Sequence, residues 1–206
     1  MEMARPVNAD AAATRGRILQ CALALFSADG LPGTSLRRIA SEAGVSVALV
    51  HHYFGSKDGL YEACIEEMYA ELGELQAHLQ ERLSEGGSLE DLLAGAVRSG
   101  FRFAREHRIA TRLLWRQVVS AGQLDEDRRI SSQAPFLDAV SAGLGALTDQ
   151  PPAGLRLPLQ TVVMLTSRYA ISDDAELAFF VNEPGVDAEA AVEAHLIEVA
   201  LRLLLP

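Results

Sequence analysis

Apolar residues recur every three to four positions in the first forty residues, as they do in helices that bury one face. The first stretch is Thr14–Asp29, where Thr14 can cap the helix and Gly30 follows its end. Its buried stripe is expected to be Ile18, Leu19, Ala22, Leu25 and Phe26. After the loop GLPG, Thr34 is expected to cap a second helix with the stripe Leu36, Ile39, Ala40 and Ala43.

A third helix is expected after a turn centred on Gly44, with Ser46 as its cap and an end near Phe54. Glycine tolerates the positive φ that such a turn needs. Val45 is a small apolar residue that can fold inward there, and Ala40 is small where the two helices must approach. Two short helices joined in this way after a longer one have the outline of a helix-turn-helix within a three-helix bundle.

The rest of the chain is also helical in pattern. A fourth helix, capped by Ser56, is expected to run to about Ser84, with the loops DQPPAG and NEPG breaking the pattern further on. Later helices are expected at 88–107, 108–121, from near Pro135 to about Leu147, at 157–173 and at 187–205. The prediction is an all-α protein of about nine helices. It divides into a disordered arm (residues 1–13), the three-helix bundle (14–55) and a larger helical domain (56–206).

Charge divides the chain in the same place. The net charge is −10, which by itself argues against a nucleic-acid partner. Residues 1–60 carry six basic and five acidic side chains, so this part is at +1 and the remainder at −11. A surface for nucleic acid must therefore be argued locally, within the near-neutral N-terminal part. The cysteines, Cys21 and Cys64, lie in helical patterns and form no close pair, which favours buried, reduced thiols.

Several classes of function find no support in the sequence. It lacks a phosphate-binding loop, a GxSxG elbow, an HExxH pair and a Cys/His set with metal-ligand spacing, so we expect no enzyme, cofactor or metal site. No apolar run reaches the roughly 18 residues of a membrane span. The N-terminal residues also lack the pattern of a secretory signal, so we expect a cytoplasmic protein.

The third helix carries two adjacent histidines and a tyrosine in the stretch SVALVHHYFGSK. Helical geometry directs Val50 and Phe54 to the core, with Val47 near their edge. Ala48, Leu49 and His52 then face outward, and His51 and Tyr53 flank them. The two histidines differ by about 100° in direction and no second ligand follows at i+4, so a shared metal site is not expected.

The segment TSLRRIASEAGVSVALVHHYFGSKDGL resembles the DNA-binding segment of the TetR family of bacterial transcriptional repressors. The resemblance covers roughly residues 14–65. It is carried by the positions Thr34, Ile39, Ala40, Ala43, Gly44, Val45, Ser46, Tyr53, Phe54, Ser56, Lys57 and Leu60. It implies that the third helix lies in the major groove and that the second crosses the DNA backbone. The remaining two-thirds of the chain resembles the family only in length and helical character.

The resemblance gives each residue of this segment an expected role. The hydroxyls of Thr34 and Ser46 and the ammonium of Lys57 suit phosphate oxygens. Arg37 is expected at a base edge or the backbone, His52 and Leu49 at base edges, and His51 and Tyr53 at flanking phosphates. The complete expected set is Thr34, Arg37, Ser46, Val47, Ala48, Leu49, His51, His52, Tyr53 and Lys57. Two alternatives stay open, with Tyr53 as part of the core and His51 as a solvated helix residue.

The sequence departs from the family pattern at the front of this helix. Family members often carry Lys, Gly and Thr where Val47, Ala48 and Leu49 stand here. These side chains offer only apolar contact, for instance to thymine methyl groups. Base discrimination is therefore expected to rest on few hydrogen bonds and more on DNA shape.

The larger domain is expected to hold a ligand pocket and a dimer interface. Candidate pocket residues are Phe101, Phe103, His107, Arg112, Trp115, Met164, Arg168 and Tyr169, a composition that fits plain core equally well. The resemblance implies that the last two helices pair with their copies in a four-helix interface. The interface candidates are Val162, Val192, Leu196, Val199 and Leu203. The alternative is that both helices complete a monomeric core.

These expectations combine into one function, a homodimeric repressor that binds double-stranded DNA at a palindromic operator and is released by a small-molecule ligand. Ligand binding among the larger domain's helices would shift the fourth helix and change the spacing of the DNA-binding domains. Two other functions stay open. One is a DNA-organising protein with no inducer, and the other is an enzyme with a DNA-binding head.

Overall fold

The computed structural model describes residues 7–84, 88–122 and 126–205, and these ranges contain helices and no strand. The first helices are α1 (Val7–Gly33), α2 (Leu36–Glu42), α3 (Val47–Phe54) and α4 (Lys57–Ser84). The next are α5 (Leu89–Glu106), α6 (Arg108–Ala121), the short α7 (Glu126–Arg128), a π-helical turn (Arg129–Gln133) and α8 (Ala134–Thr148). The last are α9 (Pro152–Ala170), α10 (Asp174–Val181) and α11 (Ala188–Leu204). The all-α prediction is confirmed.

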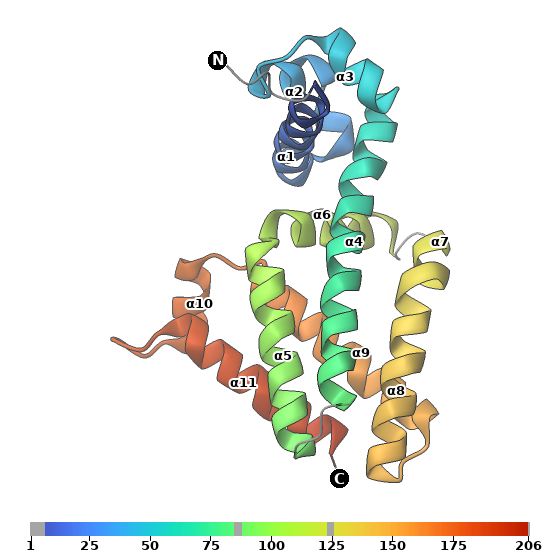
Figure 1. The fold of residues 1–206 in the computed structure, drawn as a ribbon. Helices are drawn as coiled ribbons and strands as arrows, with labels where there is room; N and C mark the ends of the chain where they lie inside the picture. Colours follow the sequence, from blue (N-terminus) through green and yellow to red (C-terminus); the bar gives the residue numbers. More distant parts are fainter. Residues whose placement is uncertain (1–6, 85–87, 123–125, 206) are drawn as a thin grey trace, which may run out of the picture.

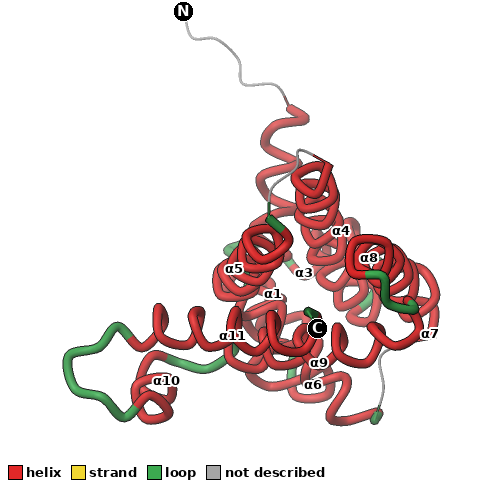
Figure 2. Tube along the Cα trace, turned by 90° about the horizontal axis from the view of Figure 1, so that it is seen from below, coloured by secondary structure: helices red, strands yellow, loops and turns green. Residues whose placement is uncertain are grey.

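The helices form a small head on an elongated body (Figure 1). The head consists of α1, α2 and α3, and α4 runs from it down the length of the body. In the body, α5, α9 and α11 pack on one another, and α8 packs on α9. Viewed along the long axis, α4, α5 and α8 lie around the helices α9 and α11 (Figure 2). Helix α6 lies across the top of the body and packs against α1 of the head.

One hydrophobic core joins the head to the first turns of α4. Phe26, Ile39, Val50 and Leu60, one from each of the first four helices, are at most 1 % exposed. Burying an aliphatic or aromatic side chain of this size contributes about 1.5–3 kcal/mol. The core also includes Leu113 of α6, so the apolar packing does not stop at the predicted boundary after residue 55. Head and body are therefore joined by α4 and by α6.

Helix α1 differs from the predicted first helix at both ends. It begins at Val7, not Thr14, because the alanine-rich run before Thr14 favours helix and Asp10 suits the first turn. Of the predicted disordered arm, residues 1–6 lie outside the described residues. At its other end α1 has a kink at Gly30, whose φ of 75° and ψ of 170° are not helical.

Other boundaries differ where local signals compete. Ser35, not Thr34, is the N-cap of α2. The predicted loop DQPPAG is shorter than expected, because proline is well suited to the first helical position and α9 starts at Pro152. Helix α10 was not predicted. Its cap is Asp173, whose carboxylate accepts the Glu176 N–H at 2.8 Å, a pattern that could be recognised in the sequence.

Candidate nucleic-acid interface

The two helices α2 and α3 are held at a fixed angle by capped ends and a tight turn. The Ser35 hydroxyl accepts the N–H of Arg38 at 3.2 Å, and the Ser46 hydroxyl accepts the N–H of Leu49 at 3.2 Å. Gly44 has a φ of 63°. Beyond it the chain reverses, so that the Val45 N–H donates to the Ala40 carbonyl at 2.9 Å. The arrangement is a helix-turn-helix, with Gly44 in the role expected of it.

Helix α3 presents a narrow outer face. Val50 is 1 % exposed and belongs to the head core, whereas Ala48, His51 and His52 are exposed. The other predicted contacts, Val47, Leu49 and Tyr53, are half-buried, and Val47 and Tyr53 pack against the head core. The structure therefore brings Ala48, His51 and His52 together on the exposed side of α3.

Two of the expected phosphate contacts point into the protein. Thr34 is 2 % exposed, and its hydroxyl donates to the carbonyls of Gly30 at 2.9 Å and Leu25 at 3.2 Å. It therefore ties the kinked end of α1 together and has no free hydroxyl for DNA, which corrects the expected role. Lys57 is half-buried, and its Nζ donates to the carbonyls of Leu31 at 2.7 Å and Thr34 at 3.1 Å. Its ammonium holds the loop between α1 and α2, and this corrects the role expected for Lys57.

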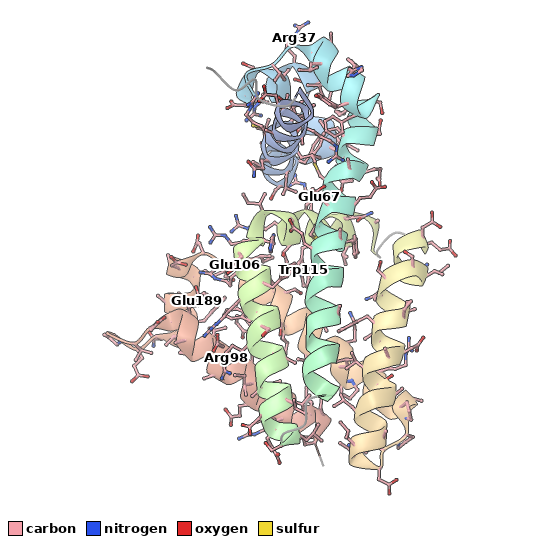
Figure 3. The ribbon with its side chains drawn as sticks, in the orientation of Figure 1. Arg37, Glu67, Arg98, Glu106, Trp115 and Glu189 are labelled. Carbon is pink, nitrogen blue, oxygen red and sulfur yellow. The ribbon has the colours of Figure 1, made fainter. Side chains whose placement is uncertain are left out.

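The arginines of the head fall into two groups. Arg37 is exposed at the far end of the head (Figure 3), and Arg38 forms an ion pair with Asp29. Two exposed arginines of α1 that the sequence did not predict contact the ends of α2 and α3. Arg17 donates through Nε to the Ala43 carbonyl at 2.9 Å, and Arg15 lies 5.5 Å from the centre of the Phe54 ring. The sequence carries no signal for either contact, since both depend on how α1 crosses the other helices.

None of the residues predicted to form a ligand pocket lines the groove described below. Phe101 is fully buried in the body core, whereas Met164 is 44 % exposed. The Trp115 indole N–H donates to the Ser167 hydroxyl at 3.1 Å, which fixes α6 to α9 (Figure 3). The other aromatic candidates contact neighbouring side chains of the protein. Phe103 lies 4.3 Å from the His107 ring, His107 Nδ1 is 2.9 Å from the Glu71 carboxylate, and Tyr169 meets Phe180 edge-on.

The predicted polar anchors, Arg112 and Arg168, are used within the chain. Arg112 donates to the Ile171 carbonyl through Nε at 3.0 Å and Nη2 at 2.7 Å. Arg168 donates to the Ser172 hydroxyl at 2.7 Å and to the Glu176 carboxylate at 3.0 Å. Hydrogen bonds from Arg168, then from Ser172, lower the pKa of Glu176. Both arginines therefore fasten the corner between α9 and α10.

A groove of about 380 Å³ lies elsewhere, between α4 and the start of α8. Its lining residues are Tyr69, Leu72, Gly73, Ser131, Ser132, Pro135, Phe136 and Ala139. The π-helical turn before α8 ends just ahead of Pro135, which has no N–H to continue an ordinary helical ladder. The groove could not be predicted from the sequence, because its two walls are about sixty residues apart in the chain.

The residues predicted to form the dimer interface differ in their exposure. Val162, Val192 and Leu196 are at most 6 % exposed and belong to the body core of the single chain, so they are not available to a partner, which corrects the prediction. The stripe of α11 faces α5 and α9 of its own chain. Val199 is half-buried and Leu203 is 43 % exposed. The outer side of α9 instead exposes Leu157, at 75 %, and Met164.

No cluster of three or more His, Cys, Asp or Glu side chains with a metal-binding arrangement occurs among the described residues. No helix within these ranges is both long and apolar enough to cross a membrane.

The fold and this interface define a helix-turn-helix DNA-binding protein. Residues 18–64 match the model of the bacterial regulatory proteins of the tetR family. This segment of the chain is therefore similar to the helix-turn-helix segment of the tetR family of transcriptional regulators.

Two bacterial proteins similar to this chain are named as HTH-type transcriptional regulators. The chain is 27 % identical to the HTH-type transcriptional regulator BetI of Vibrio campbellii over 180 residues, covering 85 % of this chain and 84 % of BetI. It is 33 % identical over 106 residues to a Bacillus subtilis protein named "Probable HTH-type transcriptional regulator YttP". That match covers 52 % of this chain and about half of the relative, 51 %.

Solved structures show the same fold. A TetR-like transcriptional regulator from Rhodococcus sp. RHA1 aligns with a TM-score of 0.70 at 23 % identity, covering 98 % of this chain and 97 % of that one. The TetR family regulator PfmR from Thermus thermophilus aligns with a TM-score of 0.62 at 22 % identity, covering 90 % and 97 %. At these identities the likeness concerns the arrangement of helices and not the ligand.

Proposed function

We propose that this regulator is a homodimeric repressor that binds a palindromic operator and is released from it by a small-molecule ligand. The observation that carries the proposal is the exposed side of α3, which lies on the head at the far end of α4 from the body. A helix presented in this way can enter a major groove without obstruction from the acidic body.

The contacts of α3 with DNA follow from its chemistry. The first turn of the helix offers backbone N–H groups and the Ser46 hydroxyl to a phosphate. Ala48 and the accessible part of Leu49 offer apolar contact to thymine methyl groups, and His52 offers a ring nitrogen to a base edge. Arg37, on α2, is placed to reach the backbone. With one polar base reader, much of the specificity would rest on DNA shape.

The outer side of α9 is the proposed contact between two copies of the chain. Leu157 and Met164 are seven residues apart, two helical turns, so both lie on one side of α9. Thr161 is exposed between them. An exposed apolar row of this kind is what a two-fold interface buries. Leu203 of α11 supplies a further exposed apolar side chain.

The ligand is proposed to bind in the groove between α4 and α8. Its volume falls in the range of small-molecule sites, and its lining combines aromatic and aliphatic side chains with the hydroxyls of Ser131 and Ser132. None of the lining residues that the structure describes is charged, so a neutral, largely apolar ligand fits their chemistry. Because α4 also carries the head, a ligand that displaces α4 would alter the spacing of the two heads. A coupling of about 1–3 kcal/mol is sufficient.

The experiment is a selection of duplex DNA from a random pool, followed by fluorescence anisotropy with the enriched duplex. We expect a palindromic site, bound by two chains and weakened steeply by salt. The variant His52→Ala should weaken binding to the selected site more than to a scrambled duplex, with Glu198→Ala as a control on an exposed position of α11. If no sequence is enriched and binding at low salt is weak, the repressor proposal is rejected.

A further inference from the structure

His51 has one of its two ring nitrogens occupied. It is exposed in the last turn of α3, and its Nδ1 lies 2.8 Å from the carbonyl oxygen of Gly55, the residue that ends the helix. Gly55 adopts a φ of 71°, and its own N–H donates to the His51 carbonyl at 2.9 Å. His51 and Gly55 are therefore joined by two hydrogen bonds in opposite directions, one from the ring and one between backbone groups.

This contact determines where the ring carries its proton. A carbonyl oxygen only accepts hydrogen bonds, so Nδ1 must be the donor. In the neutral ring the other nitrogen, Nε2, then bears a lone pair and can only accept. A DNA phosphate also only accepts. Neutral His51 therefore cannot hydrogen-bond a phosphate, whereas the imidazolium can donate from Nε2 and keep its bond to Gly55.

The position of His51 on α3 favours a phosphate over a base. His51 lies to one side of the line through Ala48 and His52, the two residues proposed to contact bases. The end of a helix carries a partial negative charge that favours a cation. We propose that His51 contacts a backbone phosphate as an imidazolium, so that DNA binding takes up one proton at this residue. The inference rests on the proposed DNA-binding function.

The helices around His51 carry charged groups of both signs. His52, on α3 itself, contacts the Tyr53 ring edge-on. The neighbouring helices carry Arg37, Arg38 and Glu42 on α2, Lys57, Asp58 and Glu62 on α4, and Arg15 and Arg17 on α1. Of the cations, Arg38 pairs with Asp29, and Lys57 is bound to backbone carbonyls. A phosphate adds negative charge to this mixed set and so favours the protonated ring.

The test measures DNA affinity against pH with the selected duplex at constant salt. Wild-type affinity should fall as the pH rises, by up to about tenfold per pH unit for each of the two chains bound to the duplex. His51→Asn, which keeps a side-chain donor for Gly55 but does not titrate, should bind less tightly at pH 6 and lose most of the pH dependence. His51→Arg should also lose it, but remain tight at pH 8. His52→Asn is the matched control and should keep the wild-type slope.

The outcomes separate this inference from the proposed function. A wild-type affinity that does not change with pH, or an unchanged slope in His51→Asn, would overturn the proton uptake while leaving DNA binding intact. Failure to bind the selected duplex at any pH would reject the proposed function itself. Circular dichroism at pH 6 and 8 establishes that each variant is folded under both conditions.

Discussion

The Lys57 ammonium donates to the Leu31 carbonyl at 2.7 Å, across 26 positions of sequence. The same nitrogen donates to the Thr34 carbonyl at 3.1 Å, so a charged group at the start of α4 satisfies the turn that follows the kink in α1. A lysine at this place in the sequence pattern suggests a phosphate contact. In the structure it joins the head to the helix that enters the body.

Replacing Lys57 with methionine is expected to destabilise the fold while leaving phosphate contacts in place. Hydrogen bonds to charged groups contribute about 1.5–3 kcal/mol each, and the stem of a methionine fills most of the lysine's space. We expect a loss of about 1.5–3 kcal/mol in the free energy of unfolding by urea. The salt dependence of DNA binding should keep its wild-type slope. The matched variant Arg37→Met should give the reverse, with unchanged stability and a slope reduced by about 0.9 for each chain, about 1.8 for the dimer. A reduced slope for Lys57→Met would assign Lys57 to a phosphate after all.

Gly30 lies at the kink in α1, and substituting it tests whether the kink requires glycine. A Cβ added there would lie 2.9 Å from Nε of Arg116 on α6, and the backbone has a positive φ that side chains rarely adopt. We expect Gly30→Ala to lower stability by about 1–3 kcal/mol. Gly16→Ala, also in α1 but with nothing within 4 Å of the added atom, should raise stability by about 0.5–1 kcal/mol. Urea midpoints of both variants check the pair, and equal effects would contradict the strain at Gly30.

The proposed dimer can be separated by charge. The double variant Leu157→Asp, Met164→Asp places two carboxylates in the proposed contact, and we expect it to sediment as a monomer at concentrations where the wild type is a dimer. Central apolar contacts of an interface contribute about 2 kcal/mol or more each. Leu147→Asp is the control, since Leu147 is 59 % exposed but lies on α8. A dimeric double variant would place the interface on another surface.

Cys64 should be unreactive in the folded protein. Burial, with a smaller contribution from the Glu67 carboxylate, raises the pKa of its thiol to about 12. Because the folded pKa is raised, the reactive thiolate is scarce at every pH below that value. In a Cys21→Ser background, iodoacetamide at pH 8 should modify Cys64 slowly in buffer and completely in urea, as followed by intact mass. Rapid modification in buffer would show that this part of the head core opens readily.

Local signals in the sequence were sufficient for the helix-turn-helix. Ser46 caps α3, Gly44 takes a positive φ, α3 ends at Phe54 and Val50 faces the core, all as predicted. These features depend on the residue and its nearest neighbours in the chain, because caps, φ preferences and helical periodicity act over one or two turns. The same reasoning missed α10, where its cap Asp173 was assigned to the end of the preceding helix.

Which groups the longer side chains contact depended on the tertiary structure. Thr34 and Lys57 turn inward, and Arg112 and Arg168 fasten a corner of the body instead of facing a ligand. The apolar stripe that contains Val192 and Leu196 packs against α5 and α9 of its own chain. Periodicity shows that a helix face will be buried, but not which surface covers it. The covering surface is set by contacts between residues far apart in sequence. A helix of the same chain and a helix of a partner chain offer the same apolar surroundings, so the pattern does not distinguish between them.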